Sequence, residues 1–246
     1  MVNINSSLGK KNSRSGMVEE NFVANFLNKV RTNPLYSSYR KFKVLSNNSK
    51  TDISDGYWNI QVKKYTSKLN QKTYMGGQIG KMYLKYLCDN IGNEYSDVIE
   101  DILDPFFNAP VINGICDTSN RIMLDELNKD DVKQVLDALE KCKRSILELI
   151  LLGPFEDTAP DFFCCVKYIN KDRSNLTIYN MKSLINYLCK SKFEIRENCR
   201  SRIYLGDALY IQRKGGDNGR KGANNVQFRI VIDNIGLKPL FEHRFG

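Results

Sequence analysis

Hydrophobic residues recur at helical spacing in several segments of the chain. Residues 15–30 place five apolar side chains on one helical face, namely Phe22, Val23, Phe26, Leu27 and Val30, and Asn33-Pro34 follows as a stop signal. Residues 129–152 have the same periodicity after Asn128, a residue type that caps helices. Helices are therefore predicted over residues 15–30, 78–91, 96–103 and 129–152, with flexible ends over residues 1–14 and at the C-terminus.

Other segments alternate between apolar and polar residues, or consist of short apolar runs, and these patterns predict strands. The most regular one is residues 57–65, which follows the turn Ser54-Asp55-Gly56 and would form a hairpin with residues 50–53. Further strands are predicted over residues 39–45, 161–169, 201–213 and 225–232, and residues 176–188 begin as strand and continue as helix. The fold class predicted is α/β (α+β), with a mixed central β-sheet flanked by helices.

Charge divides the chain into three parts. Residues 1–87 carry 15 basic and 4 acidic residues (+11), residues 88–161 carry 6 and 17 (−11), and residues 162–246 carry 16 and 7 (+9). The sum is the overall net charge of +9, and an excess of this size favours a polyanionic partner. Either the basic ends hold a polyanion, or the charges merely segregate by helix face. The 246 residues are expected to form one domain, since a hydrophobic fraction of 41% excludes a wholly disordered chain.

The scarcity of histidine excludes several classes of enzyme. The only one is His243, near the end of the chain, so zinc sites built on histidine and Ser-His-Asp or Cys-His catalysis are not expected. The seven cysteines include no CxxC pair, which favours reduced thiols. No run approaches 18 apolar residues, so no membrane contact is expected. We expect a soluble, cytoplasmic protein.

The predicted hairpin at residues 50–65 carries a possible metal site. Gln61 and Lys63 are two residues apart on one strand, so both side chains lie on the same face, and Asp52 can lie beside them. A carboxylate, an amide oxygen and the Val62 carbonyl are hard oxygen ligands suited to Mg²⁺, and an adjacent ammonium can orient or deprotonate a water. This set would suffice for phosphodiester hydrolysis without histidine.

Two neighbouring carboxylates leave alternatives open. Glu20 would add to the site only if its helix packs against the sheet; otherwise it is a glutamate favoured near the start of a helix by the helix dipole. Asp55 competes with Asp52 as the ligand, although its Ser-Asp-Gly setting is typical of a turn. The alternative for the whole set is an exposed polar hairpin with no catalytic role.

A glycine-rich basic segment over residues 210–229 forms the second group of interest. Its glycines allow close approach of the backbone, and its side chains match the hydrogen-bonding edges of guanine, adenine and cytosine. The alternative is a flexible loop that contacts phosphates alone. The candidate DNA-contacting residues are Gln212, Arg213, Lys214, Asp217, Asn218, Arg220, Asn224 and Gln227.

Together the two groups resemble the PD-(D/E)xK superfamily of type II restriction endonucleases, and within it the branch of the HinPI-type and MspI enzymes. The likeness covers most of the chain and is most specific in the glycine-rich segment. The matching stretches are Gly16-x-x-x-Glu20-x-x-Val23-Ala24, Lys50-Thr51-Asp52-Ile53, Asn59-Ile60-Gln61-Val62-Lys63, Asn70-Gln71, Ile211-Gln212-Arg213-Lys214-Gly215-Gly216-Asp217-Asn218-Gly219-Arg220, Ala223-Asn224 and Gln227-Phe228.

The resemblance implies a role for each matched residue. Asp52, Gln61, Lys63 and Glu20 would be catalytic, with Asp52, Gln61 and the Val62 carbonyl as ligands of Mg²⁺. Asn70 and Gln71 would contact DNA, and the loop from Gln212 to Gln227 would read bases in the major groove. Only eight residues separate Asp52 from Gln61, which departs from the family pattern and keeps Asp55 as an alternative ligand.

The resemblance also implies the reaction and the partners. The expected activity is Mg²⁺-dependent cleavage of double-stranded DNA at a short G·C-rich palindrome, GCGC first and CCGG second, leaving 5′-phosphate ends. Residues 1–87 would form the catalytic half, residues 88–161 an acidic helical middle and residues 162–246 the DNA-recognition half. The enzyme would act as a monomer or weak dimer on DNA beside a cognate methyltransferase. The alternatives are a non-catalytic DNA-binding module and a structure-specific repair nuclease of the same superfamily.

Overall fold

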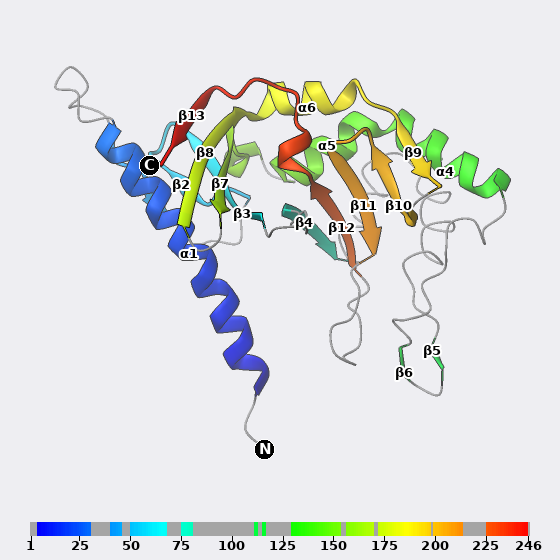
Figure 1. Ribbon diagram of the computed structural model, residues 1–246, viewed down its shortest axis with the longest axis horizontal. Helices are drawn as coiled ribbons and strands as arrows, with labels where there is room; N and C mark the ends of the chain where they lie inside the picture. The colour runs from blue at the N-terminus through cyan, green and yellow to red at the C-terminus, as the bar shows by residue number, and fades with distance from the viewer. Residues whose placement is uncertain are drawn as a thin grey trace. The chain divides into compact units, whose positions relative to one another are not determined.

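The described part of the chain is an α+β structure with a mixed sheet and helices, as predicted (Figure 1). It divides into two compact units: Met1–Thr73 with Leu151–Leu184 and Leu237–Gly246, and Tyr74–Ile150 with Ile185–Gly236. The single domain with boundaries at residues 87 and 161 stays a prediction. The computed structural model describes residues 4–30, 40–45, 50–67, 75–80, 111–112, 115–116, 129–153, 156–169, 172–197, 199–213 and 225–245.

A six-stranded sheet organises the first unit, in the order β1-β2-β3-β7-β8-β13. Strands β3 and β7 run parallel, with Lys63 opposite Cys165, and every other neighbouring pair is antiparallel. The sheet is therefore mixed, and the hairpin predicted around residue 55 is its β2–β3 pair. The strands are β1 (Lys43–Val44), β2 (Ile53–Ser54), β3 (Asn59–Ser67), β7 (Phe162–Ile169), β8 (Asp172–Asn180) and β13 (Phe241–Arg244).

Helix α1 (Ile4–Val30) packs on this sheet through the apolar stripe seen in the sequence (Figure 1). Residues two apart on β3, β7 and β8 point to the same face, and that face meets the helix. The helix begins at Ile4 rather than Ser15, so the prediction of a flexible segment over residues 4–14 was wrong. The buried members of this core are Val23, Ala24, Phe42, Ile53, Ile60, Val62, Cys164, Val166, Tyr168, Leu176 and Ile178.

The second unit contains a five-stranded antiparallel sheet in the order β4-β12-β11-β10-β9. Its strands are β4 (Met75–Gly80), β9 (Phe193–Arg196), β10 (Cys199–Leu205), β11 (Leu209–Arg213) and β12 (Asn225–Ile230). The short strands β5 (Val111–Ile112) and β6 (Ile115–Cys116) pair with each other in a separate two-stranded sheet. Helix α4 (Lys129–Lys141) belongs to the second unit, whereas α5 (Lys143–Leu152) and α6 (Met181–Cys189) contain residues of both units. Helix α6 follows β8 directly and is capped by Asn180 Oδ1, 3.0 Å from the Ser183 amide.

Three predicted elements differ from the structure, and a fourth lies outside the described residues. Residues 78–80 belong to β4 and pair with β12, so the helix predicted there was wrong over these residues, and its remainder lies outside the described residues, as does the helix predicted over 96–103. The helix predicted over 129–152 is interrupted at Cys142, although the Cys142 amide still bonds the Ala138 oxygen at 3.0 Å. A turn at Gly206, whose φ is 54°, divides the strand predicted over 201–213 into a hairpin.

The C-terminal residues are ordered by a partner that is distant in sequence. Strand β13 pairs with β8, with His243 opposite Leu176, so the predicted flexible end was wrong. The His243 ring is half-buried and lies 4.8 Å from the ring of Phe26. A sheet partner tens of residues away carries no local signal in the sequence.

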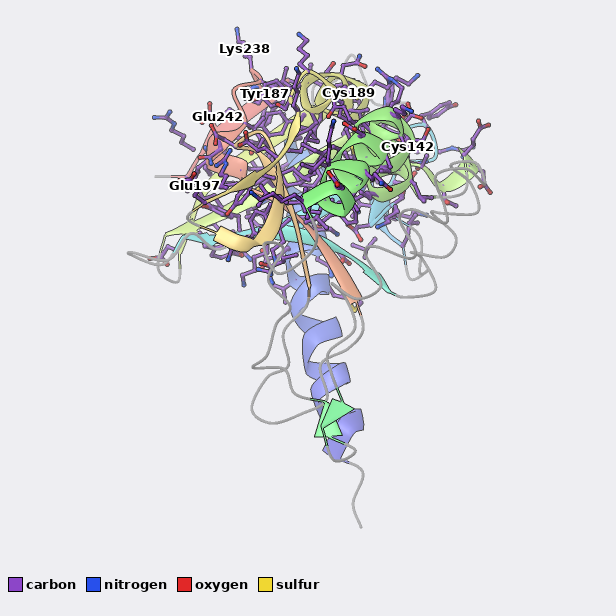
Figure 2. All side chains as sticks on the ribbon, turned by 90° about the vertical axis from the view of Figure 1, so that its right-hand side faces the viewer. Cys142, Tyr187, Cys189, Glu197, Lys238 and Glu242 are labelled. Carbon is purple, nitrogen blue, oxygen red and sulfur yellow. The ribbon has the colours of Figure 1, made fainter. Side chains whose placement is uncertain are left out.

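Reduced cysteines and the lack of a long apolar run were also expectations from the sequence. Among the described residues, Cys142, Cys164, Cys165 and Cys189 are free thiols, and Figure 2 labels Cys142 and Cys189. Burial first, and then the neighbouring Cys165, raises the pKa of the Cys164 thiol well above its ordinary value. In the part of the chain that the structure describes, no helix combines the length and the apolar character needed to cross a membrane.

Candidate active site

The backbone around Asp52 is held in place by hydrogen bonds on both sides. The Asp52 amide donates to the Ile60 oxygen at 3.0 Å, and the Asp52 oxygen accepts from the Leu45 amide at 2.9 Å. Beside it, the buried Thr51 hydroxyl donates to the Thr158 oxygen at 2.7 Å. These bonds fix Asp52 next to strand β3, as the hairpin predicted from the sequence requires.

The Asp52 carboxylate lies against two consecutive residues of β3. Its Oδ2 atom accepts a hydrogen bond from the Val62 amide at 2.6 Å and lies 3.2 Å from the Lys63 ammonium. The same Lys63 Nζ donates to the Val62 oxygen at 3.1 Å. The carboxylate oxygen and the carbonyl oxygen that were predicted to hold a metal therefore converge on a single cationic group.

Two hydrogen bonds to Asp161 hold Asn59, the first residue of β3, and so determine where Gln61 lies. The Asn59 amide donates to Asp161 Oδ2 at 2.9 Å, and the Asp161 amide donates back to the Asn59 oxygen at 2.7 Å. Gln61 follows on the face that also carries Lys63, and only 6% of Gln61 is exposed. The structure thus brings Asp52 and Lys63 into contact and places Gln61 on the same face of β3 as Lys63, as the alternation predicted.

Helix α1 brings Glu20 within electrostatic reach of this cluster. Burial first, and then the Asp52 charge, raises the pKa of the Glu20 carboxyl, whereas the Lys63 ammonium opposes that shift. The condition set from the sequence, that the Glu20 helix packs on the sheet, is met. The role of Glu20 in catalysis stays a prediction.

Lys50 belongs to the same cluster, although the sequence analysis did not single it out. Burial first, and then the positive charge of Lys63, lowers the pKa of Lys50, and Asp52 acts in the opposite direction. Its stem lies so close to Gly153 that a Cβ there would come within 2.8 Å of Lys50 Cγ. The signal in the sequence was its position two residues before Asp52, which places both on one side of an extended chain.

Asp55 is engaged in the turn that follows Asp52. Its Oδ1 atom accepts from the Tyr57 amide at 2.9 Å and from the Trp58 amide at 2.7 Å. The residue is 4% exposed. Its carboxylate is thus engaged with the backbone of the turn, which favours Asp52 over Asp55 as the ligand.

A second cluster of charges, which includes Lys64 on the face of β3 opposite Lys63, was missed. The buried Glu19 carboxylate accepts a hydrogen bond from the Tyr168 hydroxyl and lies 3.4 Å from Lys64 Nζ and 3.7 Å from Arg173 Nε. We call these four residues the Glu19 network. Burial, followed by the hydrogen bond to Glu19, raises the pKa of Tyr168 to about 12.

A signal for the Glu19 network was present in the sequence. Glu19 falls on the apolar stripe of α1, one turn before Phe22 and Val23, and a charged residue on a buried stripe needs partners. Those partners come from β3, β7 and β8, so only the fold identifies them. The network ties the turn of α1 that carries Glu20 to the sheet that carries Lys63.

The predicted DNA-contacting residues are described only in part. Gln212 lies in β11 opposite Gln227 in β12, and its Oε1 atom accepts from Arg202 Nε at 3.1 Å. Arg213 ends β11, and the pairing of β11 with β12 confirms the two strands predicted around the glycine-rich loop. The predicted contacts Asn70, Gln71, Lys214, Asp217, Asn218, Arg220 and Asn224 lie outside the described residues.

The chemical types of the predicted ligand atoms at Asp52, Gln61 and Val62 indicate how a metal ion could be bound. Over the described residues, no three His, Cys, Asp or Glu side chains gather around one point. The predicted ligands are of another kind, namely one carboxylate, one amide and one backbone carbonyl. The convergence of Asp52 Oδ2 and the Val62 oxygen on a cation fits such a set.

A comparison with known protein families shows to which family the chain belongs. The model of the R.HinP1I restriction endonuclease family matches residues 47–236, which is more than half of the chain. The chain belongs to this restriction endonuclease family. The match includes Asp52, Gln61, Lys63 and the loop between Gln212 and Gln227, whereas Glu20 precedes it.

As a member of the R.HinP1I restriction endonuclease family, the chain is a nuclease, and the predicted HinPI-type relationship is confirmed. Among solved structures, the restriction endonuclease MspI in complex with its cognate DNA is similar, with a TM-score of 0.47 and 13% sequence identity over 77% of this chain and 69% of that chain. No curated protein sequence matches the chain.

Proposed function

We propose that this family member is a type II restriction endonuclease that hydrolyses duplex DNA at a short G·C-rich palindrome and requires Mg²⁺. The observation that carries the proposal is the convergence of Asp52 Oδ2 and the Val62 oxygen on one cationic group, within 3.2 Å and 3.1 Å of Lys63 Nζ. Family membership supports the reaction class. The net charge of +9 supports a polyanionic substrate.

Each residue of the cluster would have a distinct task. Asp52, the Gln61 amide oxygen and the Val62 carbonyl would hold Mg²⁺, with Glu20 contributing through a bound water. The metal would supply charge stabilisation at the phosphate and a more acidic water. Lys63 would position the attacking water in line with the leaving 3′ oxygen, so that the products carry 5′-phosphate and 3′-hydroxyl ends. Lys50 adds a second ammonium to the cluster and can offset phosphate charge.

Base recognition would fall to the loop between β11 and β12. Its arginine, asparagine and glutamine side chains match base edges in the major groove, where each good bidentate pair contributes roughly 1–3 kcal/mol of discrimination. The proposed site is GCGC, with CCGG second. Asn70 and Gln71 would add contacts beside the catalytic strand.

The cellular setting follows from the proposed activity. A host that produces a site-specific nuclease needs protection of its own DNA, so a cognate methyltransferase is proposed as the partner enzyme. Cytoplasmic location is proposed because host DNA and invading DNA meet there. The enzyme is proposed to act as a monomer or weak dimer on DNA.

The first test identifies the cut itself. We expect discrete fragments when unmethylated plasmid DNA is incubated with the full chain in Mg²⁺, and intact plasmid in EDTA. Sequencing and end-labelling of the fragments should give one G·C-rich palindrome with 5′-phosphate ends. Fragment ends without a common sequence would instead favour a structure-specific nuclease, and intact DNA that is still bound in a gel shift would favour a binding module.

A second test concerns Arg213 and Arg220 of the glycine-rich segment. Replacing either with Ala should lower the ratio of specific to non-specific affinity by about tenfold, because a lost bidentate contact to guanine costs roughly 1–3 kcal/mol. Competition binding in Ca²⁺ measures this ratio. An equal loss on every sequence would show that these arginines contact phosphates only.

A further inference from the structure

The turn between β2 and β3 exposes two large aromatic side chains. Tyr57 is 71% exposed and Trp58 is 45% exposed. Single exposed apolar residues are common on proteins and need no explanation. These two are adjacent, however, and they lie on the hairpin that also carries Asp52 and Gln61.

Hydrogen bonds and a glycine hold the backbone of this turn in one conformation. The buried Asp55 carboxylate accepts hydrogen bonds from the Tyr57 and Trp58 amides, at 2.9 Å and 2.7 Å. The Gly56 amide donates to Ser54 Oγ at 3.0 Å, and the φ angle of Gly56 is 89°, which favours glycine. The aromatic side chains are therefore presented by a fixed backbone, which lowers the entropic cost of binding a partner.

An arginine lies beside this turn, and two lysines follow the arginine in the chain. The Arg40 guanidinium lies 6.0 Å from the Tyr57 ring centroid, and a Cβ on Gly56 would come within 3.3 Å of Arg40 Nη1. Lys41 and Lys43 are exposed, and Lys43 in β1 pairs with Ser54 in β2. We call Arg40, Lys41, Lys43, Tyr57 and Trp58 the aromatic turn patch.

The charge of the patch favours one class of partner. Its ionisable side chains other than the Tyr57 phenol are cations, and the nearest carboxylate of the turn, Asp55, is buried and bonded to the backbone. Arginine and lysine combined with exposed aromatic rings suit the phosphates and sugars of a nucleic acid. An acidic protein surface could pair with the cations, but its carboxylates would make no favourable contact with the two exposed aromatic rings.

The position of the patch suits a duplex that is bound for cleavage. Asp55 is three residues from Asp52 along an extended chain, a distance of about 10 Å at roughly 3.3 Å per residue. Duplex DNA advances about 3.4 Å per base pair, so the patch would meet the backbone within about three base pairs of the cut. This inference rests on the proposed function.

We propose that the aromatic turn patch is a second DNA-contacting surface that holds the duplex backbone beside the scissile phosphate. Arg40, Lys41 and Lys43 contact phosphates, and the rings of Tyr57 and Trp58 pack against the sugar edge. The contact is independent of base sequence and fixes the position of the duplex over Asp52 and Lys63.

Trp58 provides a direct probe, because it is the only tryptophan of the chain. The full chain in Ca²⁺ is titrated with a duplex carrying the sequence found at the fragment ends, and Trp58 emission is followed together with the anisotropy of a labelled copy of the same duplex. We expect the emission to change with the same midpoint as the anisotropy. The duplex should change the emission more than a single strand of equal length.

Variants separate the patch from other cations. Arg40→Ala should lower the slope of log K against log salt concentration by about 0.9, the value for one lost phosphate contact, and Tyr57→Ala should weaken binding without changing that slope. The matched control is Lys238→Ala, which removes an exposed cation of the C-terminal segment (Figure 2) and should leave both quantities unchanged.

Three results would contradict the proposal, each in a different way. Normal anisotropy with no change in Trp58 emission and an unchanged slope for Arg40→Ala would overturn the patch and leave the proposed function standing. A larger response to single strands would replace backbone contact with stacking on unpaired bases. Absence of any anisotropy change would contradict the proposed function itself.

Discussion

Lys63→Ala is expected to abolish DNA cleavage while leaving DNA binding in Ca²⁺ intact. The Lys63 ammonium contacts both the Asp52 carboxylate and the Val62 oxygen, so its removal takes away the group that would position the attacking water. Proton-transfer and positioning groups of this kind contribute roughly 10²–10⁴ in rate, and the loss should fall in that range or above it. Single-turnover cleavage of a short duplex measures the rate, and gel shift in Ca²⁺ measures the binding.

Lys64→Ala is the matched control for Lys63→Ala. Lys64 is the next residue of β3, and its side chain contacts Glu19 on the other face of the sheet, 3.4 Å away. The Lys64→Ala variant should cleave DNA at the rate of the unchanged chain when the temperature is well below that of unfolding. Equal cleavage by Lys63→Ala and the unchanged chain would show that Lys63 is a surface residue, and loss of cleavage in both variants would indicate a general effect of charge.

Glu19→Ala is expected to destabilise the fold by about 3 kcal/mol. Removing one partner of a buried ionic cluster typically costs roughly 3–5 kcal/mol. The lower end applies here because the side chains of Lys64 and Arg173 are 44% and 33% exposed and can reach water when their partner is lost. Denaturant unfolding measures the free energy directly.

Two comparisons make the Glu19 experiment specific. Tyr168→Phe removes the hydroxyl that donates to the Glu19 carboxylate and should cost less, roughly 1.5–3 kcal/mol. Glu242→Gln alters an exposed carboxylate of β13 and should stay within about 0.5 kcal/mol. If Glu19→Ala is as mild as Glu242→Gln, then the network does not hold α1 on the sheet.

Short-range patterns predicted the local arrangement of the hairpin that carries the candidate site. The two-residue alternation placed Gln61 and Lys63 on one face, and the Ser54-Asp55-Gly56 turn placed Asp52 beside them. This was possible because all of these residues lie within one hairpin, whose register follows from the turn and the alternation. The turn setting of Asp55 already favoured Asp52, and the structure supports that preference because Asp55 accepts the amides of its own turn.

Long-range contacts account for what the sequence left open. The partners of Glu19 come from three strands, and β13 is ordered by pairing with β8, so neither has a local pattern. Residues 78–80 join β12 as a strand despite a helical pattern, because tertiary pairing overrides local preference. The turn at Gly206-Asp207 was different, since a Gly-Asp pair is a recognised turn signal and could have been used.

The most direct test of the central claim compares Asp52→Asn with Asp55→Asn in Mg²⁺-dependent plasmid cleavage. Both changes are isosteric, and the asparagine oxygen can still accept from Val62 at position 52 or from Tyr57 and Trp58 at position 55. Only the charge is lost in each variant. We predict discrete fragments from the unchanged chain and from Asp55→Asn, and intact plasmid from Asp52→Asn. Cleavage by Asp52→Asn at the normal rate would contradict the assignment of the active site to Asp52, Gln61 and Lys63.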